Sequence, residues 1–271
     1  MLHNAHHKIY KLMIHRILHS MKKMLFCLAD LIMPRKCIVC DEKLALEEMH
    51  LCRWCLSDMP LTRFWQLRHN RMADKFNEVV QKQLEEKWET EGVTSGLHER
   101  YSYAAALFFF NDEADYKRIP YSIKYEGNTS AGKHFGKILG EHLSGAEWFG
   151  DIDAIIPVPL HWLRRWKRGY NQAEIIAQGI SAVLEKPVRT DILKRKKQTK
   201  TQTQLSIREK SRNVAGAFTA TADSDKEFRH ILLVDDVFTT GSTLLACFTA
   251  LREVFPPHVR ISVVTLGFVG N

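Results

Sequence analysis

The stretch that decides the fold is ILLVDDVFTTGST, residues Ile231–Thr243. Its four leading apolar residues indicate a strand that is buried on both faces. Two carboxylates, Asp235 and Asp236, stand at the C-terminal end of that strand, and a run of hydroxyl side chains around Gly241 follows. From Ser242 onward, apolar residues recur at helical spacing. The stretch therefore predicts a strand, an acidic pair, a hydroxyl-rich loop and a helix, in that order.

This order of elements suits a ligand that carries both a phosphate and a sugar. A helix N-terminus offers unpaired N–H groups to a phosphate, and a glycine lets the backbone approach it closely. The carboxylates would repel a phosphate, but they can accept hydrogen bonds from sugar hydroxyls. The alternative is a strand–turn–helix in which Asp and Thr are only turn and cap residues. The expected phosphate-binding residues are Thr239, Thr240, Gly241, Ser242 and Thr243.

The same stretch resembles the phosphoribosyl-pyrophosphate (PRPP) binding motif of type I phosphoribosyltransferases. It departs from that motif at Phe238, where a smaller aliphatic residue is more usual.

Positive charge is concentrated in one region of the chain. Residues 161 to 212 hold 14 Lys and Arg against 4 Asp and Glu, although the whole chain has a net charge of only +8. A localised basic region favours a localised anionic ligand. Within it, a strand over 153–160 is expected to lead into a basic loop at His161–Gln172, followed by a helix over 173–184. The cations expected to receive an anion there are Arg164, Arg165, Lys167 and Arg168.

Two features of this basic region stay open to more than one interpretation. The loop at 161–172 is either the anion receiver or a solvated basic turn, and its aromatic residues are either stacking sites or core anchors. These residues are Trp162, Trp166 and Tyr170. The stretch 194–218 is either a cation-rich loop that closes over a pyrophosphate or a disordered linker. Lys200 and Arg208 are its candidate ligands for the pyrophosphate.

Four cysteines form two Cys-x-x-Cys pairs, Cys37/Cys40 and Cys52/Cys55. Two such pairs can supply a tetrahedral set of thiolates for a structural Zn²⁺. Disulfides and a redox pair are the alternatives, and both are disfavoured because nothing in the sequence indicates secretion. We therefore expect a small zinc-binding module in a cytoplasmic protein.

The remaining sequence predicts the domain organisation. We expect a poorly defined extension at 1–24, the zinc-binding module at 25–62, a helical connector or insertion at 63–100, and a phosphoribosyltransferase-like domain at 101–271. The connector contains an amphipathic helix over 72–88. A buried strand is expected over 103–110, with helices over 114–124 and 134–143. Residues 127–134 nearly match a phosphate-binding P-loop, but His134 replaces the required Ser or Thr, so we predict a plain loop there. No apolar run approaches the length of a transmembrane helix.

Taken together, these pieces resemble the ComF/GntX family from about residue 25 to 269. The shared pieces are the four-cysteine module, IKYxG at 123–127, PVP at 157–159, RGYNQ at 168–172, TxxQxxL at 199–205, RNVxGAF at 212–218 and the PRPP motif. The resemblance implies an α/β, type I phosphoribosyltransferase fold, in which helices flank a mostly parallel central sheet, with a small N-terminal zinc-binding module. It also implies PRPP and Mg²⁺ as ligands, a link to DNA uptake in competent bacteria, and Asp235 and Asp236 as the catalytic residues.

Two functions are therefore expected. The first is a phosphoribosyltransferase that transfers phosphoribosyl from PRPP to an unidentified acceptor with loss of pyrophosphate. The alternative is a non-catalytic PRPP-domain protein that binds single-stranded DNA or a DNA-processing partner, using the zinc-binding module and the basic region as contact surfaces.

Overall fold

The computed structural model describes residues 30, 33–91, 99–111, 113–196, 216–221 and 227–270. Internal contacts divide the chain into two compact units, Met1–Met59 and Pro60–Asn271. The boundaries of the four predicted segments stay a prediction. None of the helices in the described part of the chain combines the length and apolarity needed to cross a membrane.

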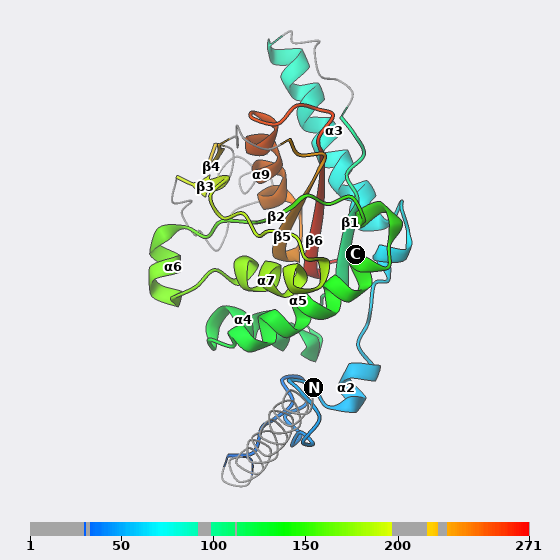
Figure 1. Ribbon diagram of the computed structural model, residues 1–271, viewed down its shortest axis with the longest axis vertical. Coiled ribbons are helices and arrows are strands. Elements are labelled where there is room, and N and C mark those ends of the chain that lie inside the picture. Colours follow the sequence, from blue (N-terminus) through cyan, green and yellow to red (C-terminus); the bar gives the residue numbers. More distant parts are fainter. Residues whose placement is uncertain are drawn as a thin grey trace, which may run out of the picture. The chain divides into compact units, whose positions relative to one another are not determined.

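The second unit is built on a four-stranded parallel sheet (Figure 1). Its strands lie in the order β1-β6-β5-β2, with bounds β1 Ala104–Phe109, β6 Arg260–Phe268, β5 His230–Phe238 and β2 Ala154–Pro157. Nearly every strand residue is buried, as expected for a parallel sheet covered on both faces. The predicted α/β fold class with a mostly parallel sheet is confirmed.

Two helices pack closely against each other and on the sheet. They are α5 (Thr129–Ser144) and α7 (Gln172–Leu184), which run side by side in Figure 1. Their backbones approach so closely that a Cβ at Gly136 or Gly179 would meet backbone atoms of the facing helix. The predicted loop at 127–133 is present only at Gly127 and Asn128 and was wrong from Thr129 onward, because Asn128 caps α5 by accepting a hydrogen bond from the Ala131 N–H, at 3.0 Å. Glycine-rich sequence is typical of loops, but here the glycines allow the two helices to pack closely.

Ahead of α5 lies a shorter helix, α4 (Arg118–Tyr125), which follows the 3₁₀ turn η2 (Asp115–Lys117). A further 3₁₀ turn, η3 (Glu147–Phe149), lies between α5 and β2. The segment that would need a strand before a P-loop is therefore helical, which agrees with the rejection of that motif.

Two further helices pack together, α9 (Ser242–Arg252) and α3 (Arg71–Glu91). The predicted helix over 72–88 is present, but one side of it belongs to the core. Met72, Ala73 and Phe76 have no exposed surface, and the Phe76 ring contacts Phe238 and Phe248 edge-on. This side of α3 is therefore part of the core of the second unit. The 3₁₀ turn η1 (Phe64–Gln66) precedes α3.

The expected basic loop at 161–172 also needs correction. Most of it forms a short helix, α6 (Trp162–Arg168), which His161 caps at the N-terminus and Gly169 ends at φ +82°. The segment after α7 continues into a small antiparallel ribbon of β3 (Leu193–Arg195) and β4 (Phe218–Ala220).

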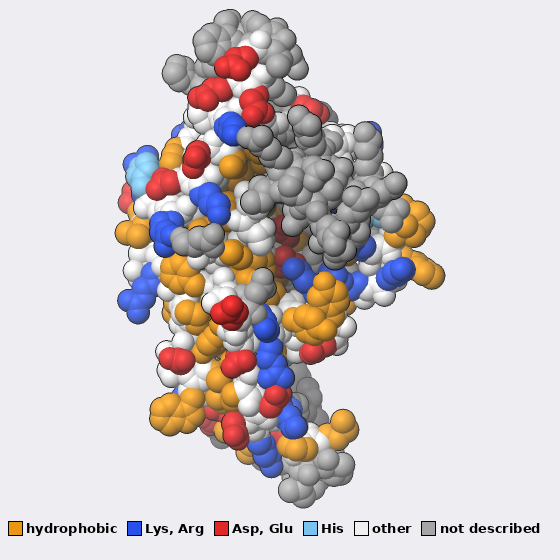
Figure 2. Space-filling view, turned by 180° about the vertical axis from the view of Figure 1, so that it is seen from behind, with side chains coloured by type: hydrophobic (Ala, Val, Ile, Leu, Met, Phe, Trp, Pro, Cys, Tyr) orange, Lys and Arg blue, Asp and Glu red, His pale blue; other side chains and the backbone are white. Residues whose placement is uncertain are grey.

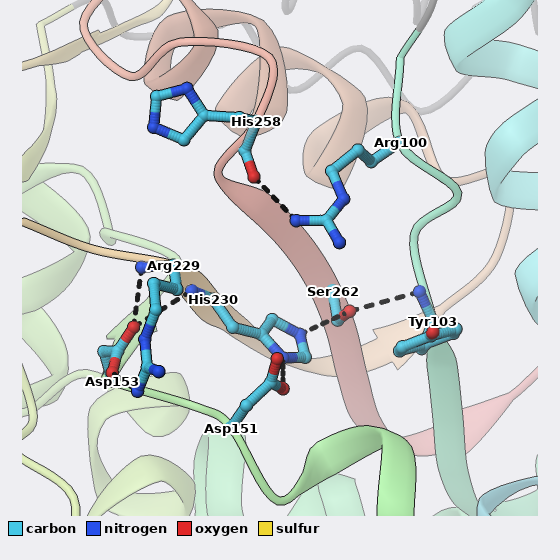
Figure 3. Close-up of polar contacts among 8 residues, drawn as sticks. All are labelled: Arg100, Tyr103, Asp151, Asp153, Arg229, His230, His258 and Ser262. Carbon is cyan, nitrogen blue, oxygen red and sulfur yellow. Dashed lines mark hydrogen bonds and ion pairs between the residues drawn. The ribbon is translucent and has the colours of Figure 1, made fainter.

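A chain of hydrogen bonds joins the N-terminal ends of the strands (Figure 3). His230 Nδ1 lies 2.5 Å from Asp151 Oδ1, His230 Nε2 lies 2.8 Å from Ser262 Oγ, and the Tyr103 N–H donates to the same Oγ at 3.1 Å. His230 and Ser262 have no exposed surface, so the serine is closed to substrates despite its His and Asp neighbours. Burial, the largest influence, lowers the pKa of His230, and a neutral imidazole fits both contacts. This network connects strands; it is not a nucleophile site.

Candidate active site and metal centre

The acidic pair lies at the C-terminal end of β5, where parallel α/β sheets place their ligands. Asp236 is 5% exposed, and its Oδ1 lies 3.1 Å from Lys124 Nζ on α4. The other carboxylate oxygen, Oδ2, is buried and has no hydrogen-bond partner in the described part of the chain. A buried carboxylate oxygen normally has a partner. Asp236 is therefore equipped to accept a hydrogen bond from a ligand.

Asp235 has a different environment, because successive residues of a strand point to opposite faces. Burial and the negative charge of Asp236 raise the pKa of Asp235 to about 7, against weaker opposing influences from Lys124 and Arg195. The charges of Asp236 and Asp235 in turn raise the pKa of Lys124, although burial, the largest single influence on it, acts to lower that pKa. At neutral pH the site thus holds the ammonium of Lys124 and, in Asp235, a carboxyl group that is close to the midpoint of its titration.

The hydroxyl-rich loop follows directly. Gly241 has φ +78°, and a Cβ there would come within 2.9 Å of the Phe238 ring, so only glycine fits without strain. Thr240 Oγ1 and Ser242 Oγ lie 2.8 Å apart. The N-cap residue of α9 is Gly241, which has no side chain, and the Ser242 N–H donates a hydrogen bond to Thr240 Oγ1 at 3.4 Å. The predicted arrangement of strand, acidic pair, loop and helix is therefore present, with β5 extending through both carboxylates to Phe238.

Two short motifs of the sequence meet beside this pair. Tyr170 donates a hydrogen bond from its hydroxyl to the Ile123 carbonyl, and the Arg168 guanidinium lies 5.4 Å from the centre of the Tyr125 ring. Asn171 caps α7 and donates to the Val158 carbonyl at 3.0 Å. These contacts hold α4 against the region that follows β2. They explain how the IKY and RGYNQ segments together place Lys124 at Asp236.

The cations predicted to receive an anion have different surroundings. Arg165 lies 3.3 Å from Glu174, and Arg168 donates to Gln172 as well as stacking on Tyr125. Arg164 lies close enough to Arg195 of β3 for its charge, together with burial as the larger cause, to lower the pKa of Arg195. Asp235 acts on Arg195 in the opposite direction. Lys167 is exposed. Lys200 and Arg208 lie outside the described residues.

Several aromatic side chains are exposed next to these cations. Trp162 and Trp166 of α6 are 65% and 80% exposed, so the interpretation of them as core anchors was wrong, whereas Tyr170 anchors α4. Tyr121 and Tyr125 of α4 are also exposed, with ring centres 4.8 Å apart. In Figure 2, hydrophobic side chains and Lys and Arg side chains lie next to one another on the right of the view, where α6 lies.

The first unit contains the four-cysteine cluster. The sulfur atoms of Cys37, Cys40, Cys52 and Cys55 all lie within 4.8 Å of one another, and those of Cys40 and Cys52 are 3.7 Å apart. Four sulfurs around a tetrahedral zinc at about 2.3 Å would lie about 3.8 Å apart, so this cluster can hold such a metal ion. Cys52 is the N-cap residue of the short helix α2 (Arg53–Ser57), and its sulfur accepts a hydrogen bond from the Cys55 N–H at 3.5 Å.

The local backbone favours a thiolate at Cys37, whereas burial and the neighbouring cysteines raise the pKa of Cys55. Burial raises the pKa of the Cys37 thiol, but hydrogen bonds from the backbone at Cys40, Cys52 and Val39 together outweigh it and lower that pKa to about 7. Cys247 of α9 is buried and does not belong to the cluster.

Comparisons with known proteins agree with this geometry. Residues 167–267 match the model of the phosphoribosyl transferase domain. This part of the chain is similar to phosphoribosyl transferase domains. Competence protein F of Haemophilus influenzae is 42% identical over 110 residues, which are 40% of this chain and 48% of that protein. DNA utilization protein YhgH of Escherichia coli K12 is 39% identical over 92 residues, 34% of this chain and 40% of that protein. Competence protein ComFC of Bacillus subtilis is 32% identical over 100 residues, 36% of this chain and 38% of that protein.

The chain thus spans less than half the length of each of these relatives. The matches and the four-cysteine cluster confirm the resemblance to the ComF/GntX family that the sequence indicated. The matched phosphoribosyl transferase domain includes the acidic pair, the hydroxyl-rich loop and Arg168, whereas Lys124 and α3 lie outside the matched residues.

Sequence reasoning missed three basic residues at the site. They are Lys75, Lys124 and Arg195, each from a different element. Lys124 was visible as part of the IKY segment, but its role depends on a contact with Asp236 that no local pattern indicates. For Lys75 and Arg195 the sequence contains no comparable signal.

Proposed function

We propose that the phosphoribosyl transferase domain binds PRPP and transfers its phosphoribosyl group to an acceptor. The observation that supports this most strongly is the buried Asp236 carboxylate. One of its oxygens is paired with Lys124 and the other has no partner in the described part of the chain, at the end of a strand that leads into the hydroxyl-rich loop. In this proposal Asp235 and Asp236 accept hydrogen bonds from the ribose hydroxyls, and residues 239–243 bind the 5′-phosphate.

The proposed reaction is a displacement at C1 of the ribose. The bond from C1 to the pyrophosphate oxygen breaks, pyrophosphate leaves with the electron pair, and the acceptor nucleophile forms the new bond to C1. Positive charge develops on the ribose in the transition state, and the carboxylates of Asp235 and Asp236 stabilise it at close range. Lys124 keeps Asp236 oriented. Arg164 and Arg195 line the side where the pyrophosphate would leave, with Arg165, Arg168, Lys200 and Arg208 as further candidates.

Mg²⁺, bound together with PRPP, would neutralise charge on the pyrophosphate. The chain's own contribution is to hold the sugar: the Oδ2 of Asp236, which has no partner among the described residues, suits a ribose hydroxyl, which is an uncharged donor, better than a phosphate.

Ligand-induced stabilisation tests this proposal. We expect PRPP with Mg²⁺ to raise the melting temperature of the second unit, because a ligand that binds only the folded state stabilises it. Asp236→Asn combined with Asp235→Asn should abolish the shift. Asp153→Asn should keep it, because Asp153 directly precedes β2 and lies at the other, N-terminal end of the strands. A wild-type protein that shows no shift at millimolar PRPP would refute the proposal. Pyrophosphate release in a screen of nucleobases and amines would then identify the acceptor.

A second candidate function is binding of single-stranded DNA or of a DNA-processing partner. It is favoured by the exposure of Trp162 and Trp166 between basic side chains, since aromatic rings with nearby cations bind the bases and backbone of a single strand. The names of two relatives, competence protein and DNA utilization protein, refer to competence and to DNA. In this second function, phosphates of the strand take the place of pyrophosphate.

Binding of a fluorescent oligonucleotide tests the second candidate. We expect affinity that falls steeply with salt, and a loss of at least about tenfold in the Trp162→Ala, Trp166→Ala double variant, because stacking contributes about 1–3 kcal/mol per base. Trp54→Ala, an exposed tryptophan of the first unit, is the matched control. Equal affinity of all three proteins would argue against the role of α6. We further propose that the cysteine cluster holds a structural Zn²⁺ and that the protein works in the cytoplasm, where thiols stay reduced.

A further inference from the structure

The helix α3 reaches the hydroxyl-rich loop, although it lies far from it in sequence and outside the matched domain. The Nζ of Lys75 donates a hydrogen bond to the carbonyl oxygen of Thr239, at 3.1 Å. Its Nζ also lies 5.9 Å from the ring centres of both Phe238 and Phe268. The ammonium thus lies beside two aromatic rings and at the first residue of the loop.

Lys75 is placed by a helix that is fixed on both sides of it. Asn70 caps α3, accepting from the N–H groups of Met72 and Ala73, and donates to the Ala104 carbonyl of β1 at 2.9 Å. About two turns further on, Asn77 exchanges two hydrogen bonds of 2.9 Å with the backbone of Ser102. A lysine held between two such anchors is presented to the loop by rigid secondary structure.

The charge of Lys75 is not balanced by a carboxylate. No ion pair joins it to Asp or Glu among the residues that the structure describes, and the neighbouring Asp74 accepts a hydrogen bond from the Tyr101 hydroxyl instead. An ammonium has three donors, and the Thr239 carbonyl uses one. That contact also neutralises a carbonyl dipole that would otherwise oppose an anion at the loop.

The unusual Phe238 belongs to the same arrangement. Its ring lies against Gly241, contacts Phe76 of α3 and has its centre 5.9 Å from Lys75 Nζ. The departure from the motif and the presence of α3 are thus connected: the large ring fills the space between loop and helix.

We propose that Lys75 is a binding residue for the 5′-phosphate end of the ligand, supplied to the phosphoribosyl transferase domain by α3. This inference rests on the proposed function and adds a specificity residue to it. Lys75 adds positive potential to the loop, so that the site prefers a phosphorylated ribose. The pyrophosphate end of the ligand, at Arg164 and Arg195, is held by other elements and does not depend on Lys75.

Calorimetric binding of three ligands tests the proposal: PRPP with Mg²⁺, ribose 5-phosphate and inorganic pyrophosphate. We expect Lys75→Met to weaken binding of PRPP and of ribose 5-phosphate about 2- to 5-fold, the range for a partly exposed ion contact, and to leave binding of pyrophosphate unchanged. Lys75→Arg should retain most of the affinity. Lys82→Met, an exposed lysine of the same helix, should equal the wild type.

The outcomes separate this inference from the function on which it rests. Wild-type affinity of Lys75→Met for ribose 5-phosphate would overturn the role of Lys75 while leaving the PRPP site intact. An equal loss for pyrophosphate would also overturn it, because it would show a general disturbance of the fold. A wild-type protein that binds neither PRPP nor ribose 5-phosphate would refute the proposed function itself, and the inference with it.

Discussion

Substitution of Asp235 or Asp236 by asparagine should change the stability of the protein in opposite directions. Asp235 has a raised pKa, about 7 against an ordinary 3.8, chiefly because of burial and then because of Asp236. A raised folded-state pKa means that this carboxyl favours folding below the unfolded-state value and opposes it as pH rises through about 7. At pH 8 the full difference corresponds to ~4 kcal/mol, because each pKa unit is worth about 1.36 kcal/mol. Asp235→Asn removes the penalty.

The net gain should be smaller than this limit. The ionised Asp235 is also attracted by Lys124 and Arg195, and asparagine loses that attraction. We expect Asp235→Asn to be more stable than the wild type by ~1–3 kcal/mol at pH 8, and equally stable at pH 4. For a unit of this size ~1 kcal/mol shifts the melting temperature by about 2–4 °C. Asp236→Asn should instead lose ~1–2 kcal/mol at pH 8, because it leaves the largely buried Lys124 without its 3.1 Å partner.

Urea unfolding at pH 4, 6 and 8, followed by circular dichroism, measures both effects. The reasoning is refuted if both variants shift stability in the same direction at pH 8, or if the gain of Asp235→Asn persists at pH 4. A gain confined to high pH would identify Asp235 as a carboxyl kept at a cost to stability, which is typical of residues retained for binding or catalysis.

Three further predictions concern other parts of the chain. Gly241→Ala should weaken PRPP binding at least about tenfold, because its φ of +78° disfavours a side chain and a Cβ there would lie 2.9 Å from the Phe238 ring. Adding Phe238→Leu should restore part of the affinity. Calorimetry measures both effects, and full affinity of Gly241→Ala would contradict the prediction. Purified protein should contain one zinc ion per chain by elemental analysis, Cys40→Ser should lose it and Cys247→Ala should keep it, whereas metal-free wild type under reducing conditions would rule the zinc site out. The pKa of His230 is lowered, so this residue contributes stability above about pH 6.5 that is lost as pH falls. The melting temperature of His230→Gln should therefore decline less between pH 7.5 and 5 than that of the wild type. Parallel declines would contradict this role.

What could be predicted from the sequence was local. The order of apolar, acidic and hydroxyl residues at 231–243 determines β5, the loop and the start of α9, because each depends on near neighbours. The cysteine spacing likewise predicts the cluster. The start of α5 was missed because a cap at Asn128 followed by Thr, Ser and Gly has the composition of a loop, and only packing against α7 reveals why small residues are needed there.

The basic half of the site could not be predicted, because it is made of long-range contacts. Lys124 and Lys75 reach β5 and its loop from α4 and α3, more than a hundred residues earlier in the chain. Their side chains carry no local signature: each is one lysine on an amphipathic helix. The helical form of residues 162–168 was missed for a related reason, since a seven-residue helix is too short to show clear periodicity and depends on its caps at His161 and Gly169.

The contacts of the RGYNQ segment bear on what the basic region does. Arg168 is committed to Gln172 and the Tyr125 ring, Tyr170 to the Ile123 carbonyl, and Asn171 to Val158 and the start of α7. These residues position α4, and with it Lys124, and their side chains are already engaged in contacts within the protein. An anion near α6 therefore depends mainly on Arg164 and Arg195, which lie near each other, and Arg195 also lies near Asp235. Arg168→Ala should then act on PRPP binding through Lys124: combined with Lys124→Met it should cost little more than Lys124→Met alone, because coupled residues are not additive. Additive losses in that double-variant comparison would show instead that Arg168 contacts the ligand directly.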